Sequence, residues 1–559
     1  MFKKLKNESG VVLIVCLSIL FMLALIGIAS ITTSNTDMDI ADNEYKTTGA
    51  FYAAESGLER AAASITTSYR TTGTPPSPLP ADTVSELNYV YSFKTTDDGP
   101  AVHTELKEGA YEGLFGMVKT FTINSLGLNN NSNAGVELEM QISDALIPLF
   151  QFAVFYEYDL EIAPGADMTL GGRVHTNQNM YLQAGQDLYI NSYLTAAGNI
   201  YHGRKPGSGQ SETTRDVWIM DADGNYQTMK NSNSTFLDAT DPDWVSESID
   251  RWGGRVEDGN HGITELYMPV VSDGPPTNLI DRADGGSNPD SYENQAGLKF
   301  IDGQAFYRQM DGTWLNVTAN LQAQNVISDA TFRDGREGQD VYSLDIDVSR
   351  LNSSGFFPSN GIIYASGAAS DSYVRAFRLT NGTELAGALT IASDNPIYTV
   401  GDYNTVNKRP ASLITDALTI LSGNWNDGSS YQSLNNRIAS NTQVNACYMT
   451  GNTETGSPGH NYSGGFENLP RFLEKWDSKT LTWRGAAVDL WYSRQSTGAW
   501  SYGSFYTAPN RDWAFDPDLL DPNNMPPGTP MVNIVQRMNW TQRIHNVPNP
   551  EAYYEMGQQ

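Results

Sequence analysis

The stretch GVVLIVCLSILFMLALIGIASI, residues 10–31, decides the architecture of this chain. It carries no charged residue, and its weakly disruptive positions are Ser18, Gly27 and Ser30. A helix rises 1.5 Å per residue, so the run from Val11 to Ile31 is about 30 Å long. That length matches the hydrocarbon core of a bilayer. We therefore predict a membrane-spanning helix over residues 11–31.

The charges on either side of this run predict its orientation. Lys3, Lys4 and Lys6 precede it, whereas Asp37 and Asp39 follow within two turns. Basic flanks stay in the cytoplasm. We therefore expect a single-pass protein of a bacterial inner membrane, with a cytoplasmic N-terminus and an exported remainder.

Three interpretations of the apolar run compete. A secretory signal peptide would have a shorter apolar core followed by a small-residue cleavage site, but here the run continues directly into more helix. A simple membrane anchor is the second interpretation. The third is a short basic leader, residues 1–10, that is cut before the helix, and it fits most of the features.

The leader with Ser9-Gly10 and the following run resembles the class III signal of type IV prepilins. NEYKTTGAFYAAESGLERA, residues 43–61, is similar to the N-terminal region of PilX-type minor pilins, and AAESGLE is its most specific part. The resemblance implies that a prepilin peptidase cuts after Gly10 and methylates Val11. It also implies that other pilins or pseudopilins and an inner-membrane assembly platform are the partners, with membrane lipid around the helix before assembly and the pilus or cell surface as the final location.

One position departs from the family pattern. Most pilins carry Glu five residues after the cut, where this chain has Val15. In the family that carboxylate meets the N-terminal amine of a neighbouring subunit, because a bare carboxylate in lipid is costly. The tip pseudopilin of type II secretion also lacks it. We therefore predict a minor subunit located at the tip of a filament or initiating it.

Beyond the membrane run, three- and four-residue spacing of apolar residues predicts that the helix continues to about Ile65. The segment TTGTPPSPLP, residues 71–80, then marks a boundary. Alternating runs over residues 85–150 predict a small antiparallel sheet laid against the helix, as in pilins. The apolar run LIPLFQFAVFY, residues 146–156, should be buried.

From Glu157 the sequence pattern changes to short apolar pairs separated by Gly, Asn and Asp. Residues 157–202 and 360–402 show this pattern at intervals of six to eight residues. It predicts rungs resembling those of a parallel β-helix, although an antiparallel sandwich would look similar. The polar segment 203–355 is interpreted as an insertion or a separate module, and residues 411–559 as a β-rich region that wraps a surface. The predicted fold class is α+β, mainly β.

Composition and motifs limit the partners and the kinds of site that this chain can have. The formal net charge of −29 excludes nucleic acid as the main partner. The two cysteines, Cys16 and Cys447, are too few for a disulfide framework or a cysteine-rich metal site. The six histidines show no ligand spacing, and phosphate-loop, nucleophile-elbow and dinucleotide motifs are absent. We expect a protein that is not an enzyme and needs no cofactor.

One weaker signal remains, which resembles the start of a calcium-binding loop. Asp221, Asp223 and Asn225 begin an EF-hand-like spacing, but the twelfth position is Ser232 instead of Glu. Calcium there is therefore a weak candidate beside an ordinary solvated turn.

Two other functions stay open. A membrane-anchored adhesin or glycan-binding surface protein would use exposed tryptophans, for which the candidates are Trp425, Trp476, Trp483, Trp491, Trp500 and Trp513. Burial in the core is the alternative for each. A β-helix polysaccharide-active enzyme would need convergent carboxylates, and nothing in the sequence singles out a pair.

Overall fold

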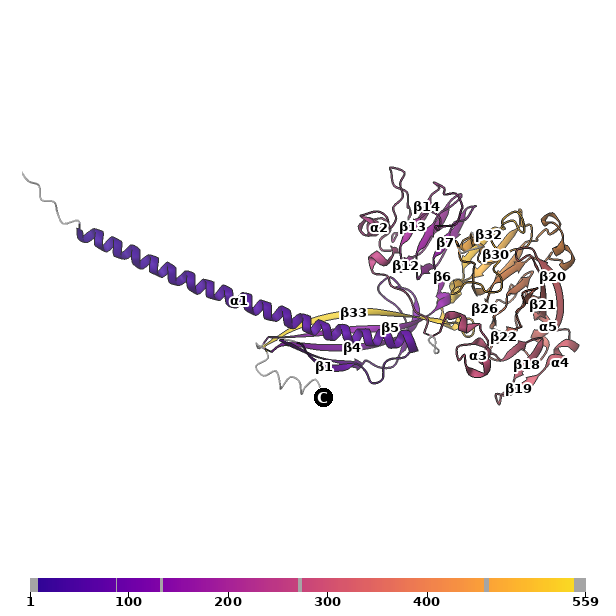
Figure 1. Cartoon of the computed structure of the whole chain (residues 1–559), viewed down its shortest axis with the longest axis horizontal. Coiled ribbons are helices and arrows are strands. Elements are labelled where there is room, and N and C mark those ends of the chain that lie inside the picture. The colour runs from indigo at the N-terminus through magenta and orange to yellow at the C-terminus, as the bar shows by residue number, and fades with distance from the viewer. Residues whose placement is uncertain (1–8, 87, 131–133, 270–273, 457–461, 547–559) are drawn as a thin grey trace, which may run out of the picture.

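Helix α1, Ser9–Thr72, projects from one end of the molecule, and its second half lies on a sheet that leads into a larger body (Figure 1). This computed structural model describes residues 9–86, 88–130, 134–269, 274–456 and 462–546. The 64 residues of α1 correspond to about 96 Å of continuous helix. It runs past the predicted end at Ile65 and stops where Gly73, at φ +66°, precedes Pro75 and Pro76.

The proximal sheet consists of β1–β5 and β33 and is antiparallel throughout. Its strands are β1 (Ala81–Glu86), β2 (Tyr89–Asp97), β3 (Val102–Glu105), β4 (Phe115–Asn129), β5 (Ala134–Pro148) and β33 (Met531–Asn546). Their order is β1-β2-β4-β5-β33, and β3 pairs with the beginning of β4. One face packs on α1, where Leu58, Ile65, Phe121 and Ile142 are among the buried side chains.

The first part of the body is a coil of short parallel strands on three sides. One side holds β7 (Leu160–Ile162), β10 (Met180–Leu182) and β13 (Ile200–His202); the second holds β8 (Met168–Leu170), β11 (Leu188–Ile190), β14 (Val217–Met220) and, antiparallel, β15 (Tyr226–Thr228). The third holds β6 (Phe152–Tyr156), β9 (Arg173–Thr176), β12 (Leu194–Ala196) and β16 (Val256–Glu257). Leu160, Met180 and Ile200 are direct partners, so one turn takes 20 residues. Apolar pairs therefore recur along the sequence because they stack on the same inner wall.

The second part of the body repeats this arrangement. It has three parallel ladders. The first holds β17 (Leu298–Ile301), β22 (Ile362–Ser366), β24 (Leu389–Ser393), β26 (Ala411–Thr415), β29 (Cys447–Thr450) and β31 (Ala487–Asp489). The second holds β21 (Gln339–Asp347), β23 (Val374–Thr380), β25 (Ile397–Val400) and β27 (Leu418–Leu421), and the third holds β28 (Thr442–Asn445), β30 (Thr480–Gly485) and β32 (Asn510–Phe515). Strands β18 (Gln304–Arg308), β19 (Trp314–Asn316) and β20 (Ile327–Asp334) add antiparallel pairs at the far end. The predicted fold class, α+β and mainly β with parallel rungs, is confirmed.

The two parts form one stack that the chain enters and leaves at its middle. Strand β6 lies parallel to β9 on one side and to β31 on the other, with Val154 opposite Ala487. A single core of buried residues runs through both parts. Both connections lead to the proximal sheet, because β5 precedes β6 and β33 follows β32. The body is therefore held at its centre by two adjacent strands, with a lobe on either side (Figure 1).

The segment 203–355, interpreted from the sequence as an insertion or a separate module, instead belongs to both halves of the stack. Strands β14 and β16 extend the first part, and α2 (Trp244–Trp252) covers its end with Trp244 and Trp252 buried. Strands β17–β21 begin the second part, flanked by α3 (Tyr292–Gln295), α4 (Thr318–Ala323) and α5 (Val348–Ser353). Turn-rich sequence hid these strands because most of them are only a few residues long.

The region 411–559 also differs from the surface-wrapping prediction. Within its described residues, β26–β32 are rungs of the stack, and their inward residues are buried. Strand β33 then runs 16 residues back along β5 and closes the proximal sheet. A β-bulge between Arg537 and Trp540 shifts its register.

The junction of β5 and β33 contains a buried carboxylate. Asp144 is almost fully buried and accepts a hydrogen bond from the Asn533 amide across the two strands. Burial raises the pKa of Asp144 to about 7, and the Asn533 hydrogen bond offsets part of that rise.

This carboxylate should make stability depend on pH. Its folded-state pKa lies above the unfolded value of about 3.9, so the folded protein binds the extra proton and stability falls as the pH rises from about 4 to about 7. Asp144→Asn should remove up to roughly 4 kcal/mol of that fall. Denaturant unfolding of the full chain in detergent at pH 4.5 and 7.5 measures this, with exposed Asp98→Asn as the control. An unchanged pH dependence in Asp144→Asn would contradict the assignment.

Candidate functional site: the N-terminal helix

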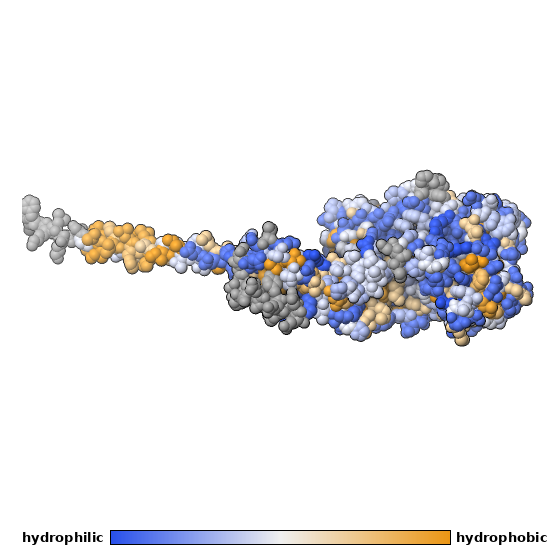
Figure 2. All heavy atoms as spheres, turned by 60° about the horizontal axis from the view of Figure 1, so that its bottom comes forward, coloured by the Kyte–Doolittle hydropathy of each residue, from blue (hydrophilic) through white to orange (hydrophobic). Residues whose placement is uncertain are grey.

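The first half of α1 is apolar and stands free of the rest of the protein. Within the described residues, α1 is the one helix long and apolar enough to cross a membrane, and none of its most apolar window is buried. Leu13, Ile19 and Phe21 each expose more than half of their side-chain surface. Figure 2 shows this stretch as an apolar rod. Removing it from water is worth on the order of tens of kcal/mol, so lipid or other apolar helices must surround it.

The residues predicted for processing and assembly lie at the start of this rod. Gly10 and Val11 are in the first turns of α1 and are exposed, and a Cβ on Gly10 would have open space for 4 Å around it. Val15 is also exposed on the apolar half. Cleavage after Gly10 stays a prediction. The side chain at position 15 is a hydrocarbon, so this helix offers no carboxylate to a neighbouring amine there.

The AAESGLE motif, residues 53–59, is where α1 meets the proximal sheet. Ala53, Ala54 and Leu58 are buried, and Gly57 lies so close to the sheet that a Cβ there would be 2.2 Å from Ser125 Oγ. Glu59 accepts two hydrogen bonds of 2.6 Å from the Arg537 guanidinium on β33. The motif thus alternates small or apolar contact residues with polar residues at the border.

Helix and sheet approach each other closely at Gly127 on β4. A Cβ on this residue would lie 2.0 Å from the Ala50 carbonyl oxygen and 2.5 Å from the Ala54 nitrogen. Both are backbone atoms that cannot move aside without bending α1. Small residues on both elements therefore set the distance at which the helix packs.

The C-terminal end of α1 borders a cavity of about 210 Å³ between the proximal sheet and the body. The Arg70 guanidinium lies 3.3 Å from the centre of the Tyr267 ring, a cation–π contact. Across the cavity, burial raises the pKa of Glu157 to about 7, against a hydrogen bond of 2.8 Å from the Asn177 amide. Tyr267 also forms an isolated bridge to Asn533 of β33. These contacts join the stalk, which consists of α1 and the proximal sheet, to the body.

The calcium candidates lie in a hairpin turn. Asp221 accepts hydrogen bonds from the backbone nitrogens of Asp223 (3.0 Å) and Asn225 (2.8 Å), and from the Gln227 amide (2.8 Å). The Gln227 bond, followed by the Asn225 bond, lowers the pKa of Asp221. Its two oxygens therefore already serve the turn, and among the described residues no cluster of three metal-ligating side chains occurs.

The tryptophans proposed for glycan binding pack inside the protein. Trp476, Trp483, Trp491 and Trp513 are buried, and Trp425 and Trp500 are half-buried against aromatic neighbours. Trp483 also donates a hydrogen bond of 2.9 Å to the Ala446 carbonyl. Core packing accounts for these residues.

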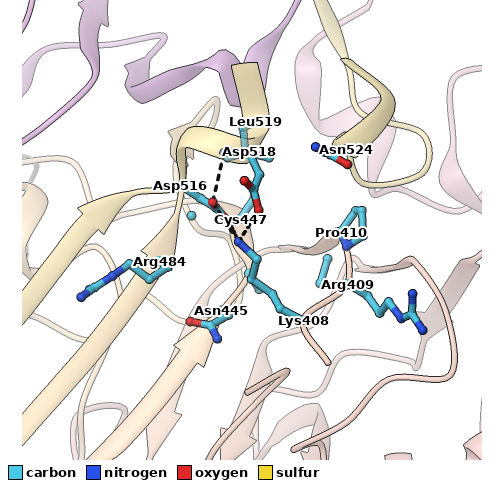
Figure 3. A pocket seen from close by; sticks show the side chains of 13 residues that line it. Lys408, Arg409, Pro410, Asn445, Cys447, Arg484, Asp516, Asp518, Leu519 and Asn524 are labelled. Carbon is cyan, nitrogen blue, oxygen red and sulfur yellow. Dashed lines mark hydrogen bonds and ion pairs between the residues drawn. The ribbon is translucent and has the colours of Figure 1, made fainter. Parts of the chain in front are cut away.

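A small cavity of about 80 Å³ lies beside the segment that links β32 to β33. Figure 3 shows the side chains that line it. Lys408 Nζ lies 2.7 Å from an Asp516 oxygen and 2.8 Å from an Asp518 oxygen. Burial alone would lower the pKa of Lys408, but the two carboxylates outweigh it and raise the pKa. Burial also raises the pKa of the Cys447 thiol well above its usual value. The two ion pairs of Lys408 hold the segment that links β32 to β33 against the body.

Sequence reasoning missed β33, the strand that carries the Arg537 partner of the motif. Val532 and Ile534 are buried and alternate with polar neighbours, which is a strand signal. The bulge after Arg537 breaks that alternation, and nothing local in the sequence shows that the partner is β5, almost 400 residues earlier.

Comparison with known proteins addresses the N-terminal segment. Residues 9–59 match the family model described as PilX N-terminal. No curated protein matches the chain. The crystal structure of the competence-associated pilin ComZ from Thermus thermophilus is similar at 12% identity, over 90% of this chain and 98% of that chain, with a TM-score of 0.28. That score is too low to bear on the arrangement of the body.

A free apolar half-helix continuous with a half-helix packed on an antiparallel sheet defines a pilin-like protein. The match over residues 9–59 makes this likeness more specific, because that segment is similar to the N-terminal region of PilX-type proteins.

The packing of α1 on the sheet predicts the effect of one methyl group. Gly127→Ala places a Cβ against the Ala50 carbonyl and should destabilise the protein by about 1–3 kcal/mol through overpacking. Gly171→Ala is the matched control because nothing lies within 4 Å of a Cβ there. Thermal and denaturant unfolding of both variants measure the difference. Equal stability of the two variants would show that the close contact is unimportant.

Proposed function

We propose that this protein is a minor pilin-like subunit of a type IV pilus or a related secretion filament. The observation that carries the proposal is the bare apolar half of α1, which belongs to a segment of PilX type. The helix sits in the bacterial inner membrane with its N-terminus in the cytoplasm until assembly. It then exchanges lipid for the helices of other pilins, and the body is displayed at the cell surface.

Processing is part of this proposal. A prepilin peptidase removes residues 1–10 and methylates Val11, and an inner-membrane platform inserts the subunit into the filament. The position of Gly10 in the exposed first turn of α1 supports this step, because a protease can reach the bond in that turn.

Val15 supports a position at the filament tip. A subunit without a carboxylate there cannot bind the amine of a neighbour through this position. Its own N-terminal amine can still bind the carboxylate of another subunit. Such one-sided pairing suits a terminal subunit, and a repeating subunit would need both halves.

We also propose that the body is not an enzyme. The buried carboxylates of its stack serve the fold: Asp416 accepts hydrogen bonds from three successive backbone nitrogens, residues 494–496, and Glu474 accepts two from Ser422. Because the six candidate tryptophans are buried or half-buried, the adhesin alternative has lost its main support.

The mature N-terminus tests processing. Mass spectrometry of chain recovered from filaments should show methylated Val11 as the first residue. Gly10→Val should keep Met1, remain in the membrane and be lost from the filament fraction. Gly27→Ala, with open space around that position, is the control and should be processed normally. An intact Met1 in wild-type filaments would exclude a prepilin.

The distribution of the subunit tests its position. Gold labelling of an epitope placed after Gly312, in the exposed hairpin between β18 and β19, should mark filament ends. Label repeated along the shaft would refute the tip assignment and leave the pilin-like function intact.

A further inference from the structure

A groove of about 420 Å³ runs between α1 and the edge of the proximal sheet formed by β1 and β2. Tyrosines line it from both sides. Tyr45 and Tyr52 come from α1, two turns apart, and Tyr89 and Tyr91 come from β2. Glu86, at the end of β1, supplies a carboxylate. The groove is on the opposite edge of the sheet from β33.

The floor of the groove is fixed, whereas its rim is free. The Tyr89 side chain lies against Gly49, where a Cβ would be 2.1 Å from the Tyr89 hydroxyl. Tyr91 is buried. By contrast, Tyr45 exposes 73% and Tyr52 exposes 60% of its surface. Two large aromatic side chains this exposed, beside a preformed hollow, indicate a contact that the isolated subunit does not make.

The charges around the groove are unbalanced. Lys46, next to Tyr45, is bound to Asp42 at 2.5 Å, and Arg60 lies 3.7 Å from Asp82 of β1. Glu86 is exposed and makes no ion pair within the described part of the chain. Four tyrosine rings with one unpaired carboxylate form the surroundings that a cationic side chain prefers, because the rings attract it through their negative faces.

The position of the groove identifies where the cation comes from. Tyr45 lies 14 residues beyond Ile31, which is about 21 Å along the helix. The headgroup layer is about 5–8 Å thick on each side of the hydrocarbon core. A lipid headgroup therefore cannot reach the groove when α1 spans the membrane. A neighbouring subunit whose own body lies beside this part of α1 can reach it, because α1 itself forms one wall of the groove.

We propose that this groove binds a lysine or arginine side chain of a neighbouring pilin subunit, through Tyr45, Tyr52, Tyr89 and Glu86. The proposal rests on the pilin-like function and specifies how the subunit is recognised. The contact is made outside the membrane, so it can select a partner independently of position 15 within it.

Photo-crosslinking in cells that assemble the filament tests the contact. Benzoylphenylalanine is placed at Ser56, an exposed residue that lines the groove. Irradiation should join the full-length chain to another pilin, at a peptide that contains the contacting Lys or Arg. An adduct with lipid, or none in filaments that contain the chain, would overturn the proposal.

Matched variants separate a cation site from simple crowding. Tyr45→Phe with Tyr52→Phe keeps the rings and should leave adduct yield unchanged. Tyr45→Leu with Tyr52→Leu keeps apolar bulk but removes the rings, and should lower the yield about two- to five-fold. Glu86→Lys should lower it further, and Glu86→Gln less. Equal yields for the Phe and Leu pairs would exclude cation recognition.

A second probe position distinguishes this proposal from the function on which it rests. Benzoylphenylalanine at exposed Thr541 on β33 reports on the opposite edge and should not respond to the groove variants. Co-fractionation of the chain with sheared filaments reports on the pilin-like function itself. Chain present in filaments with no groove-dependent adduct refutes the groove alone; chain absent from filaments refutes both.

Discussion

The close packing of α1 on the proximal sheet is the contact on which the rest of the molecule depends. Gly127 lies directly beneath the backbone of Ala50 and Ala54, so the absence of a side chain there sets how closely the helix approaches the sheet. This contact places the second half of α1 on the sheet, and the two flanks of the helix face different neighbours. On one flank Glu59 binds Arg537 of β33; on the other the tyrosine groove opens. The two lateral surfaces of the packed half of α1 thus follow from one helix–sheet distance.

The elements with local signals could be predicted from the sequence. The membrane run needs only its own composition, and the rungs around Leu160, Met180 and Ile200 repeat because each must fill the same inner wall. The AAESGLE motif was identified from the sequence only through its resemblance to PilX-type pilins, and in the structure it lies at the helix–sheet interface. The small residues of the motif permit close approach of α1 to the sheet, and the Glu59 carboxylate reaches Arg537 on the edge strand β33.

Long-range pairing was hidden from the sequence. Nothing near Ala487 indicates that it lies beside Val154, or that Arg537 completes a site on α1. The strands in segment 203–355 do not recur at a regular interval, because turns and the short helices α2–α5 separate them, so the segment resembles an independent polar module. The tryptophans illustrate the opposite limit, since composition cannot distinguish a ring on the surface from one such as Trp476 in the core.

The central attachment of the body has a mechanical consequence. A coil of stacked rungs is ordinarily vulnerable at the ends of its chain, where pulling peels one turn after another. Here the two chain connections run from β5 into β6 and from β32 into β33, so neither outer face of the stack ends in a free strand that tension on the stalk could draw out. A load along α1 is shared by two long antiparallel strands and reaches the body at adjacent rungs. The stalk can therefore bear force while the strands of both lobes stay paired.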